Sequence, residues 1–420
     1  MTSCLDFTSK YSEPVSPGLY AHNPEYFSSF KPRIHKDSQQ SSDASIQCQI
    51  DVLGKENLGA LMGILNTHGD LTALSYPFCP PDRLALAAYL TELVFIHDDA
   101  DYRENIHTRK FESDSEARDQ ALKVGNYAPE WVNEARNKQV IAKVMYNVTK
   151  MDEKRGRKFF KAWESWKLAE KDYADVEAQR CESLEKYLTM CYDMRGCRWG
   201  LALARFVCEL DLTEEEEAKV LPLTQIAMQI MTLHNDYYSW EKENAFYYAS
   251  EEKRPVSNAV ALYMKLYSIP IERAKAEVKA KAIETEQRYL LAKKEFLKDE
   301  ANPPLATLRW LEMLEHLITG HMLWCLSCPR YYEKPNNRYL DYYRLRSEQG
   351  YTFADDCTRL GSFTSSQIGF DGDSPASSSH IWNRTTGANG YQRGHCHDKN
   401  GIITLSLFCT GGLRARFRHF

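Results

Sequence analysis

Apolar residues recur at helical spacing along most of this chain, from about residue 51 to residue 328. A period near 3.6 residues is typical of helices that bury one face. The pattern predicts helices over residues 81–104, 154–171, 182–210, 221–244, 270–298 and 305–328. No stretch alternates apolar and polar residues over the length of a strand, and no segment repeats. The sequence therefore predicts an all-α domain of roughly a dozen helices.

Local signals mark some of the helix ends. Pro81 opens the first predicted helix, because proline is tolerated in a first turn. The acidic run 214–217 predicts a capped start for the helix over 221–244, since carboxylates favour the positive end of the helix dipole. Gly196 and Gly200 are weak points in the helix over 182–210, because glycine destabilises a helix interior.

Both ends of the chain differ from the middle. Residues 1–50 combine four prolines with many serines, which predicts an irregular leader. Residues 341–420 are mostly rich in Ser, Gly, Asp, Asn and Thr, which is typical of disorder. We therefore expect a leader over 1–50, a helical domain over 51–340 and a disordered tail, a linker remnant, over 341–420.

Composition excludes several classes of protein. The net charge of the 420 residues is −5 and no dense basic stripe crosses the main domain, so a nucleic-acid partner is not expected. No apolar run approaches the roughly 18 residues of a membrane span, and no secretory signal opens the chain. The twelve cysteines are typical of buried free thiols in a reducing compartment. These features predict a soluble, cytoplasmic protein.

Three polar residues in the helix predicted over 221–244 form a candidate metal site. Asn235, Ser239 and Glu243 stand at i, i+4 and i+8, so they lie within roughly 80° of one another on a helix. An amide oxygen, a hydroxyl and a carboxylate suit a hard divalent cation. The alternative is a solvated polar face. The apolar residues that precede Asn235 predict a largely buried helix, however, and buried polar groups need partners.

A second acidic cluster follows the helix that starts at Pro81. Asp98 and Asp99 are adjacent carboxylates, which repel each other unless a cation neutralises them. Asp101 is three residues after Asp98 and shares its helical face. The alternative is a set of solvated residues at a helix end, although acids are unfavourable at the C-terminal end of the dipole.

These clusters and two further motifs resemble class I terpene cyclases, specifically the cyclase half of fungal chimeric terpene synthases of the fusicoccadiene-synthase kind. The resemblance covers about residues 10–340. It rests on four motifs in the family's order: Pro81-Asp82-Arg83-Leu84 leading to Phe95-Ile96-His97-Asp98-Asp99; Asn235 to Glu243; Ser257-Asn258-Ala259-Val260; and Trp324 with Cys328-Pro329-Arg330-Tyr331.

The resemblance implies the isoprenoid synthase helical bundle and roles for individual residues. It implies magnesium ions held by an aspartate-rich motif and an Asn-Ser-Glu motif, and a diphosphate held by cationic and hydroxyl donors. The metal ligands would be Asp98, Asp99, Asp101, Asn235, Ser239 and Glu243. The substrate contacts would add Lys242, Arg330, Tyr331 and Arg195, with Phe95 and Trp324 facing the developing cation.

Two positions depart from the family's pattern. The third acid of the aspartate-rich motif is Asp101, one position early, with Tyr102 in the usual place. The family's diphosphate-sensing arginine would fall on Cys191, which cannot supply a cation. Arg195, one turn further on, is the candidate replacement.

The resemblance implies a Mg²⁺-dependent terpene cyclase that ionises and cyclises a linear prenyl diphosphate. Geranylgeranyl diphosphate, the precursor of diterpenes, is the first choice, and geranylfarnesyl diphosphate, the precursor of sesterterpenes, is the second. A catalytically impaired binding protein with the cyclase fold and a chain-elongating prenyltransferase stay open as alternatives. No second pair of aspartate-rich motifs is present, so a separate prenyltransferase is expected to supply the substrate. Whether the chain forms a homo-oligomer is open.

Overall fold

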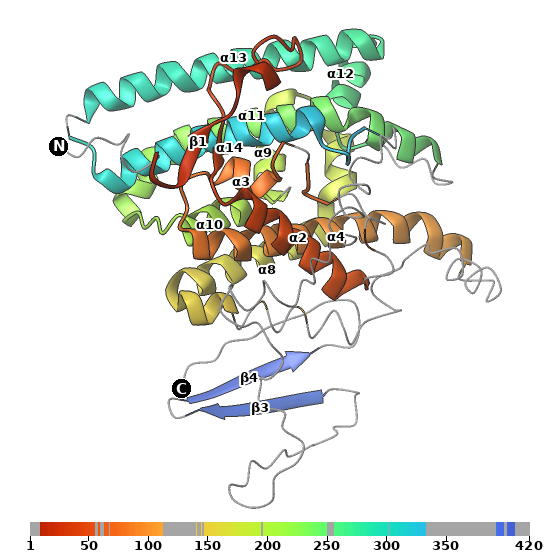
Figure 1. The fold of residues 1–420 in the computed structure, drawn as a ribbon. Helices are drawn as coiled ribbons and strands as arrows, with labels where there is room; N and C mark the ends of the chain where they lie inside the picture. Colours follow the sequence, from red (N-terminus) through yellow and green to blue (C-terminus); the bar gives the residue numbers. More distant parts are fainter. Residues whose placement is uncertain are drawn as a thin grey trace, which may run out of the picture. The chain divides into compact units, whose positions relative to one another are not determined.

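The computed structural model describes residues 9–54, 58, 63–66, 68–111, 140, 144, 147–194, 196–249, 256–300, 302–332, 392–398 and 401–407, with some side chains inside these ranges left out. The chain divides into two compact units, residues 1–353 and 354–420. Helices make up most of the described part of the first unit (Figure 1). Among the described residues, no helix has the length and apolar character needed to cross a membrane.

Apolar periodicity placed the long helices close to their observed bounds. The bundle also contains the helices α3 and α12, which the sequence analysis did not predict. Their bounds are α3 (Leu71–Ser75), α4 (Pro81–Phe111), α8 (Glu153–Arg180), α11 (Glu214–Ala249), α12 (Ala259–Tyr267), α13 (Ile271–Asp299) and α14 (Leu305–Ser327). The helix α11 packs against both α13 and α14, and α14 packs against α3 (Figure 1). The predicted all-α bundle is therefore confirmed.

The single helix predicted over residues 182–210 is two helices, α9 (Leu184–Met194) and α10 (Cys197–Val207). Gly196 precedes α10 with a left-handed φ of 78°. A Cβ atom at this position would lie 2.4 Å from the indole nitrogen of Trp199. The conformation and the close approach both require glycine, so the weak point at Gly196 is a complete break.

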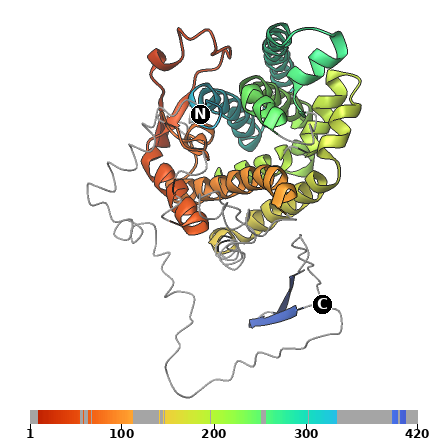
Figure 2. The same cartoon turned by 90° about the vertical axis from the view of Figure 1, so that its right-hand side faces the viewer.

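The boundary of the irregular leader at residue 50 is wrong, because α2 (Ser38–Leu53) is a helix of the bundle that packs against α4. Its buried face includes Ser41, Ser45 and Gln49, so apolar periodicity does not reveal it. The strand β1 (Ser12–Pro14), the 3-10 helix η1 (Pro17–Leu19) and β2 (Arg33–His35) precede it, and the strands pair antiparallel. These elements lie along one edge of the unit (Figure 2).

Residues 24–29, here called the strap, dock on the helices α11 and α13. The Phe27 ring stacks on Tyr238 at 6.0 Å, and the Lys279 ammonium lies 5.2 Å from its centre. The Ser29 amide and hydroxyl both donate to the Glu286 carboxylate, at 2.7 and 2.6 Å. The strap thereby joins the start of the chain to helices formed more than 200 residues later.

In the second unit the described residues form one antiparallel pair, β3 (Gln392–Asp398) and β4 (Gly401–Leu407), with His397 opposite Ile402. The strand β4 includes most of a short apolar run at 402–408. The sequence analysis did not predict these two strands. The rest of the predicted tail lies outside the described residues.

Candidate active site

The helix α11 carries the three predicted metal ligands on one face. Asn235 and Glu243 are half-buried, and Ser239 is 2% exposed. The Ser239 Oγ is buried and has no hydrogen-bond partner among the described residues. A buried hydroxyl without a partner costs on the order of 1–3 kcal/mol. A cation bound between Asn235 and Glu243 would remove this cost, so the donor set fits a divalent metal.

Asn258 holds Glu243 from the start of α12. Its Nδ2 donates to Glu243 Oε2 at 3.0 Å and to the Asp236 carbonyl at 2.9 Å. Its Oδ1 accepts from the Val260 amide at 2.8 Å and caps α12. A polar partner behind a metal ligand fixes the direction of the ligand's lone pairs.

Asp236 is a fully buried acid that sequence reasoning did not assign to the site. Its Oδ2 accepts from the Tyr187 hydroxyl at 2.7 Å and from the Ala259 amide at 2.8 Å. These bonds tie α11 to α9 and α12 directly behind Asn235. The only signal in the sequence was the motif at Ser257–Val260, to which no contact could be assigned.

Asn235 also contacts the closing pair of the domain. Its Nδ2 donates to the Tyr331 hydroxyl at 2.8 Å, which leaves its amide oxygen for other partners. Burial raises the pKa of Tyr331 well above its ordinary value. The phenol therefore keeps its proton, which it can donate to an anion.

An aromatic cluster links α4 to the end of α14. The Phe95 and Trp324 rings are perpendicular with centres 5.7 Å apart, and Trp324 and Tyr331 are 5.5 Å apart. The Arg330 guanidinium lies 4.8 Å from the centre of the Phe95 ring. The structure thus brings together Asn235, Phe95, Trp324, Arg330 and Tyr331, and their roles toward a substrate stay predictions.

The positive charges of Lys242 and Arg330 both influence the pKa of the same buried thiol, that of Cys328. Burial raises the pKa of Cys328 to about 12, and the positive charges of Arg330 and Lys242 oppose this rise. Both cations therefore lie within electrostatic range of Cys328, at the end of α14.

Other predicted site residues are described less fully. The backbone of Asp98, Asp99 and Asp101 lies in α4, one turn or more beyond Phe95, and their side chains lie outside the described residues. Arg195 also lies outside them. Cys191 is fully buried in α9. The roles of these acids and of Arg195 stay predictions.

Three histidines of α11 and α14, here called the buried histidines, are neutral at pH 7. Burial lowers the pKa of His234 and His316 to about 3 and that of His321 to about 4. The His321 ring lies 6.1 Å from the Trp324 ring. The interior beside the aromatic cluster therefore gains no positive charge from them.

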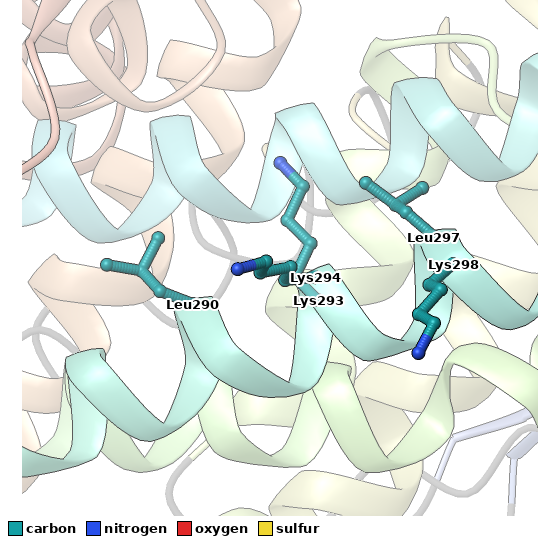
Figure 3. Close-up of a pocket in the computed structure, with 5 residues that line it drawn as sticks. All are labelled: Leu290, Lys293, Lys294, Leu297 and Lys298. Carbon is teal, nitrogen blue, oxygen red and sulfur yellow. The ribbon is translucent and has the colours of Figure 1, made fainter.

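A hollow of about 450 Å³ lies on α13 (Figure 3). Leu290, Lys293, Lys294, Leu297 and Lys298 line it, all from one helix. None of the predicted site residues belongs to this lining, so we do not assign the hollow to the candidate active site.

Comparisons with known proteins agree with this geometry. The profile of the terpene synthase family 2, C-terminal metal binding, matches residues 89–288. Conidiogenone synthase of Penicillium roqueforti is 33% identical over 79% of this chain and 45% of its own length. A cyclopiane-type diterpene synthase of Penicillium chrysogenum is 32% identical over 80% of this chain and 44% of its own length.

The chain spans about half the length of these curated relatives. Among solved structures, aristolochene synthase of Penicillium roqueforti matches with a TM-score of 0.53 and 17% identity, over 70% of this chain and 96% of its own. That likeness shows the fold. The matched profile and the sequence relatives support a class I terpene cyclase.

Proposed function

We propose that this chain is a Mg²⁺-dependent terpene cyclase that ionises and cyclises a linear prenyl diphosphate. The observation that carries the proposal is the buried, unpartnered Ser239 hydroxyl between Asn235 and Glu243 on α11. All three ligands are oxygen donors, which Mg²⁺ prefers. When bound there, the metal supplies charge stabilisation for the departing diphosphate. Asp98 and Asp99 are the proposed ligands on α4.

The residues at the end of α14 would bind and orient the leaving group. Arg330 supplies planar, bidentate donors that match phosphate oxygens. Tyr331 accepts from Asn235 and keeps a proton to donate. Lys242 adds a second cation from the Asn-Ser-Glu helix. Donors aimed at the charge that develops on a leaving group are worth on the order of 100- to 1,000-fold in rate each.

The aromatic cluster would stabilise the hydrocarbon cation. Ring faces attract positive charge through their quadrupole. Phe95 and Trp324 pack edge to face with their ring centres 5.7 Å apart, so the two rings form one continuous aromatic wall. Their place next to Arg330 puts the rings beside the proposed diphosphate site.

Geranylgeranyl diphosphate is the proposed substrate, and geranylfarnesyl diphosphate is the second choice. The matched cyclopiane-type diterpene synthase supports the first. The tail boundary, the cytoplasmic location and the separate prenyltransferase stay predictions from sequence.

The test is incubation of the purified chain with the C15, C20 and C25 diphosphates and Mg²⁺, followed by hydrocarbon analysis. Asn235→Ala and Glu243→Ala should each abolish hydrocarbon formation with unchanged helical circular dichroism. Glu241→Ala is the matched control, because this acid of the same helix is 60% exposed and pairs with Lys275. Near-normal turnover of either ligand variant at saturating Mg²⁺ would refute the assignment.

The same assay tests a second candidate, a binding protein with the cyclase fold. The buried Cys191 favours it, because a thiol stands where the family has a cation. Binding of the C20 diphosphate without release of inorganic diphosphate would support this candidate. A longer prenyl diphosphate as product would instead indicate chain elongation.

A further inference from the structure

Glu92 is a buried acid of α4 that the proposed chemistry does not use. It lies one turn before Phe95 and is fully buried. Its carboxylate accepts from Ser45 Oγ at 2.6 Å, Gln49 Nε2 at 2.7 Å and the Ile64 amide at 2.8 Å. Three donors compensate for the loss of water around a buried carboxylate. Two of them come from α2, and the third comes from residues 63–66, here called the bracket.

The bracket joins this carboxylate to Trp324. The Ile64 carbonyl accepts from the Trp324 indole nitrogen at 2.6 Å. Asn66 Nδ2 donates to the Trp324 carbonyl at 3.2 Å and to Ser327 Oγ at 2.9 Å. The side chain and the backbone of Trp324 are therefore both held by a segment that Glu92 holds in turn.

Gly63 shows how closely the bracket approaches Glu92. A Cβ atom on Gly63 would lie 1.8 Å from Glu92 Oε1, which leaves no space for any side chain. The bracket is thus fixed against the carboxylate on one side and against the last turn of α14 on the other. Arg330 and Tyr331 follow that turn directly.

We propose that Glu92 and Asn66 are positioning residues that set the orientation of the Trp324 indole and thereby the ratio of cyclisation products. The inference rests on the proposed function of the site. Cyclisation pathways that share one cation diverge according to which carbon the pocket wall exposes. Rotation of an indole beside Phe95 changes that wall directly, whereas the donors to the diphosphate belong to Arg330 and Tyr331, after the end of α14. Glu92 and Asn66 therefore act on product choice more than on ionisation.

The two variants Glu92→Met and Asn66→Ala test this separation. Methionine is about as long as glutamate but offers no strong acceptor to Ser45, Gln49 or the Ile64 amide, so Glu92→Met loosens the bracket with a modest change in volume. Asn66→Ala removes the hydrogen bonds from this side chain to the Trp324 carbonyl and to Ser327. Thr224→Val is the matched control. Thr224 of α11 accepts from the indole of Trp310 at 2.9 Å, and Trp310 lies on α14, several turns before Trp324.

With geranylgeranyl diphosphate and Mg²⁺, we expect both variants to change the ratio of main to minor hydrocarbons on the order of tenfold. Release of inorganic diphosphate should change less than about threefold. Thr224→Val should leave the ratio unchanged, even if it lowers the melting temperature as much as the two test variants do. A ratio that moves equally in the control, or in none of the variants, would overturn the proposal.

A second measurement does not depend on activity. In protein with ¹⁵N-labelled tryptophan, the indole signal of Trp324 is the one that Trp324→Phe removes. Its hydrogen exchange should accelerate on the order of tenfold in Glu92→Met and Asn66→Ala, while the Trp310 signal keeps its rate. If no diphosphate is turned over, the proposed function fails and this measurement still tests the bracket. An unchanged Trp324 rate in both variants would refute the positioning role.

Discussion

Replacing Asn258 with alanine separates the stability of the bundle from its affinity for metal. One side chain supports three bonds, to Val260, Asp236 and Glu243. Loss of the cap on α12 costs about 1 kcal/mol. The Asp236 carbonyl, which lies inside α11, also loses this additional hydrogen bond, which costs about 0.5–1.5 kcal/mol. Asn258→Ala should therefore lower the free energy of unfolding by about 1.5–2.5 kcal/mol.

The metal site should respond by a different route. Without the amide at 3.0 Å, Glu243 loses the partner that directs its carboxylate. Loss of a partner behind a metal ligand typically costs on the order of 10- to 100-fold in affinity. The Mg²⁺ concentration for half-maximal activity should rise by that factor. Urea denaturation measures the first effect, and a Mg²⁺ titration at fixed substrate measures the second.

Asn258→Ser is the matched control. Serine is a good N-cap residue but is too short to hold Glu243. It should therefore recover about 1 kcal/mol of stability while the Mg²⁺ requirement stays high. If serine restores the Mg²⁺ requirement as well, or if alanine leaves it within twofold of the wild type, Asn258 does not orient Glu243.

Three further predictions concern pH, the displaced arginine and the tail. The buried histidines have lowered pKa values, so below pH 6.5 the unfolded chain binds more protons than the folded chain. The free energy of unfolding should therefore fall by about 2 kcal/mol per histidine from pH 7 to pH 5. Urea midpoints that are the same at the two pH values would contradict this. Arg195→Ala should slow the chemical step on the order of 10- to 1,000-fold, whereas Arg198→Ala should change it less than twofold, since Arg198 is 59% exposed and pairs with Asp193. Single-turnover rates measure both effects. If Cys191→Arg raises the rate strongly and Arg195→Ala leaves it unchanged, Arg195 does not replace the family's arginine. A chain that ends at Arg344 should keep its melting temperature and activity, and a much lower melting temperature would show that the tail packs on the bundle.

The spacing of apolar and polar residues predicts which side chains share a face of one helix. It does not predict contacts that depend on residues far away in the sequence. The common face of Asn235, Ser239 and Glu243 follows from the helical repeat, so the sequence was enough to find it. The helix α2 was missed because its buried face mixes polar with apolar residues, and the partners of the polar ones, such as Glu92, come from elsewhere in the chain.

The contacts within the site depend on packing in the same way. The bond from Asn235 to Tyr331 joins residues 96 positions apart, and no local pattern predicts it. The role of Asn258 behind Glu243 depends on how α12 turns back on α11. Only the presence of these residues in recognisable motifs, not their contacts, could be derived from the sequence.

The strap sets an order of events during synthesis. Ser29 precedes its partner Glu286 by 257 residues. A ribosome adds about 5–20 residues per second, so the strap waits roughly 10–50 seconds for that partner to be made. The aromatic partners of Phe27, Tyr237 and Tyr238 of α11, are made only slightly before Glu286. The strap therefore has nothing to dock on until more than half of the chain exists, and a nascent protein arrested before α11 exposes an aromatic segment that chaperones can bind.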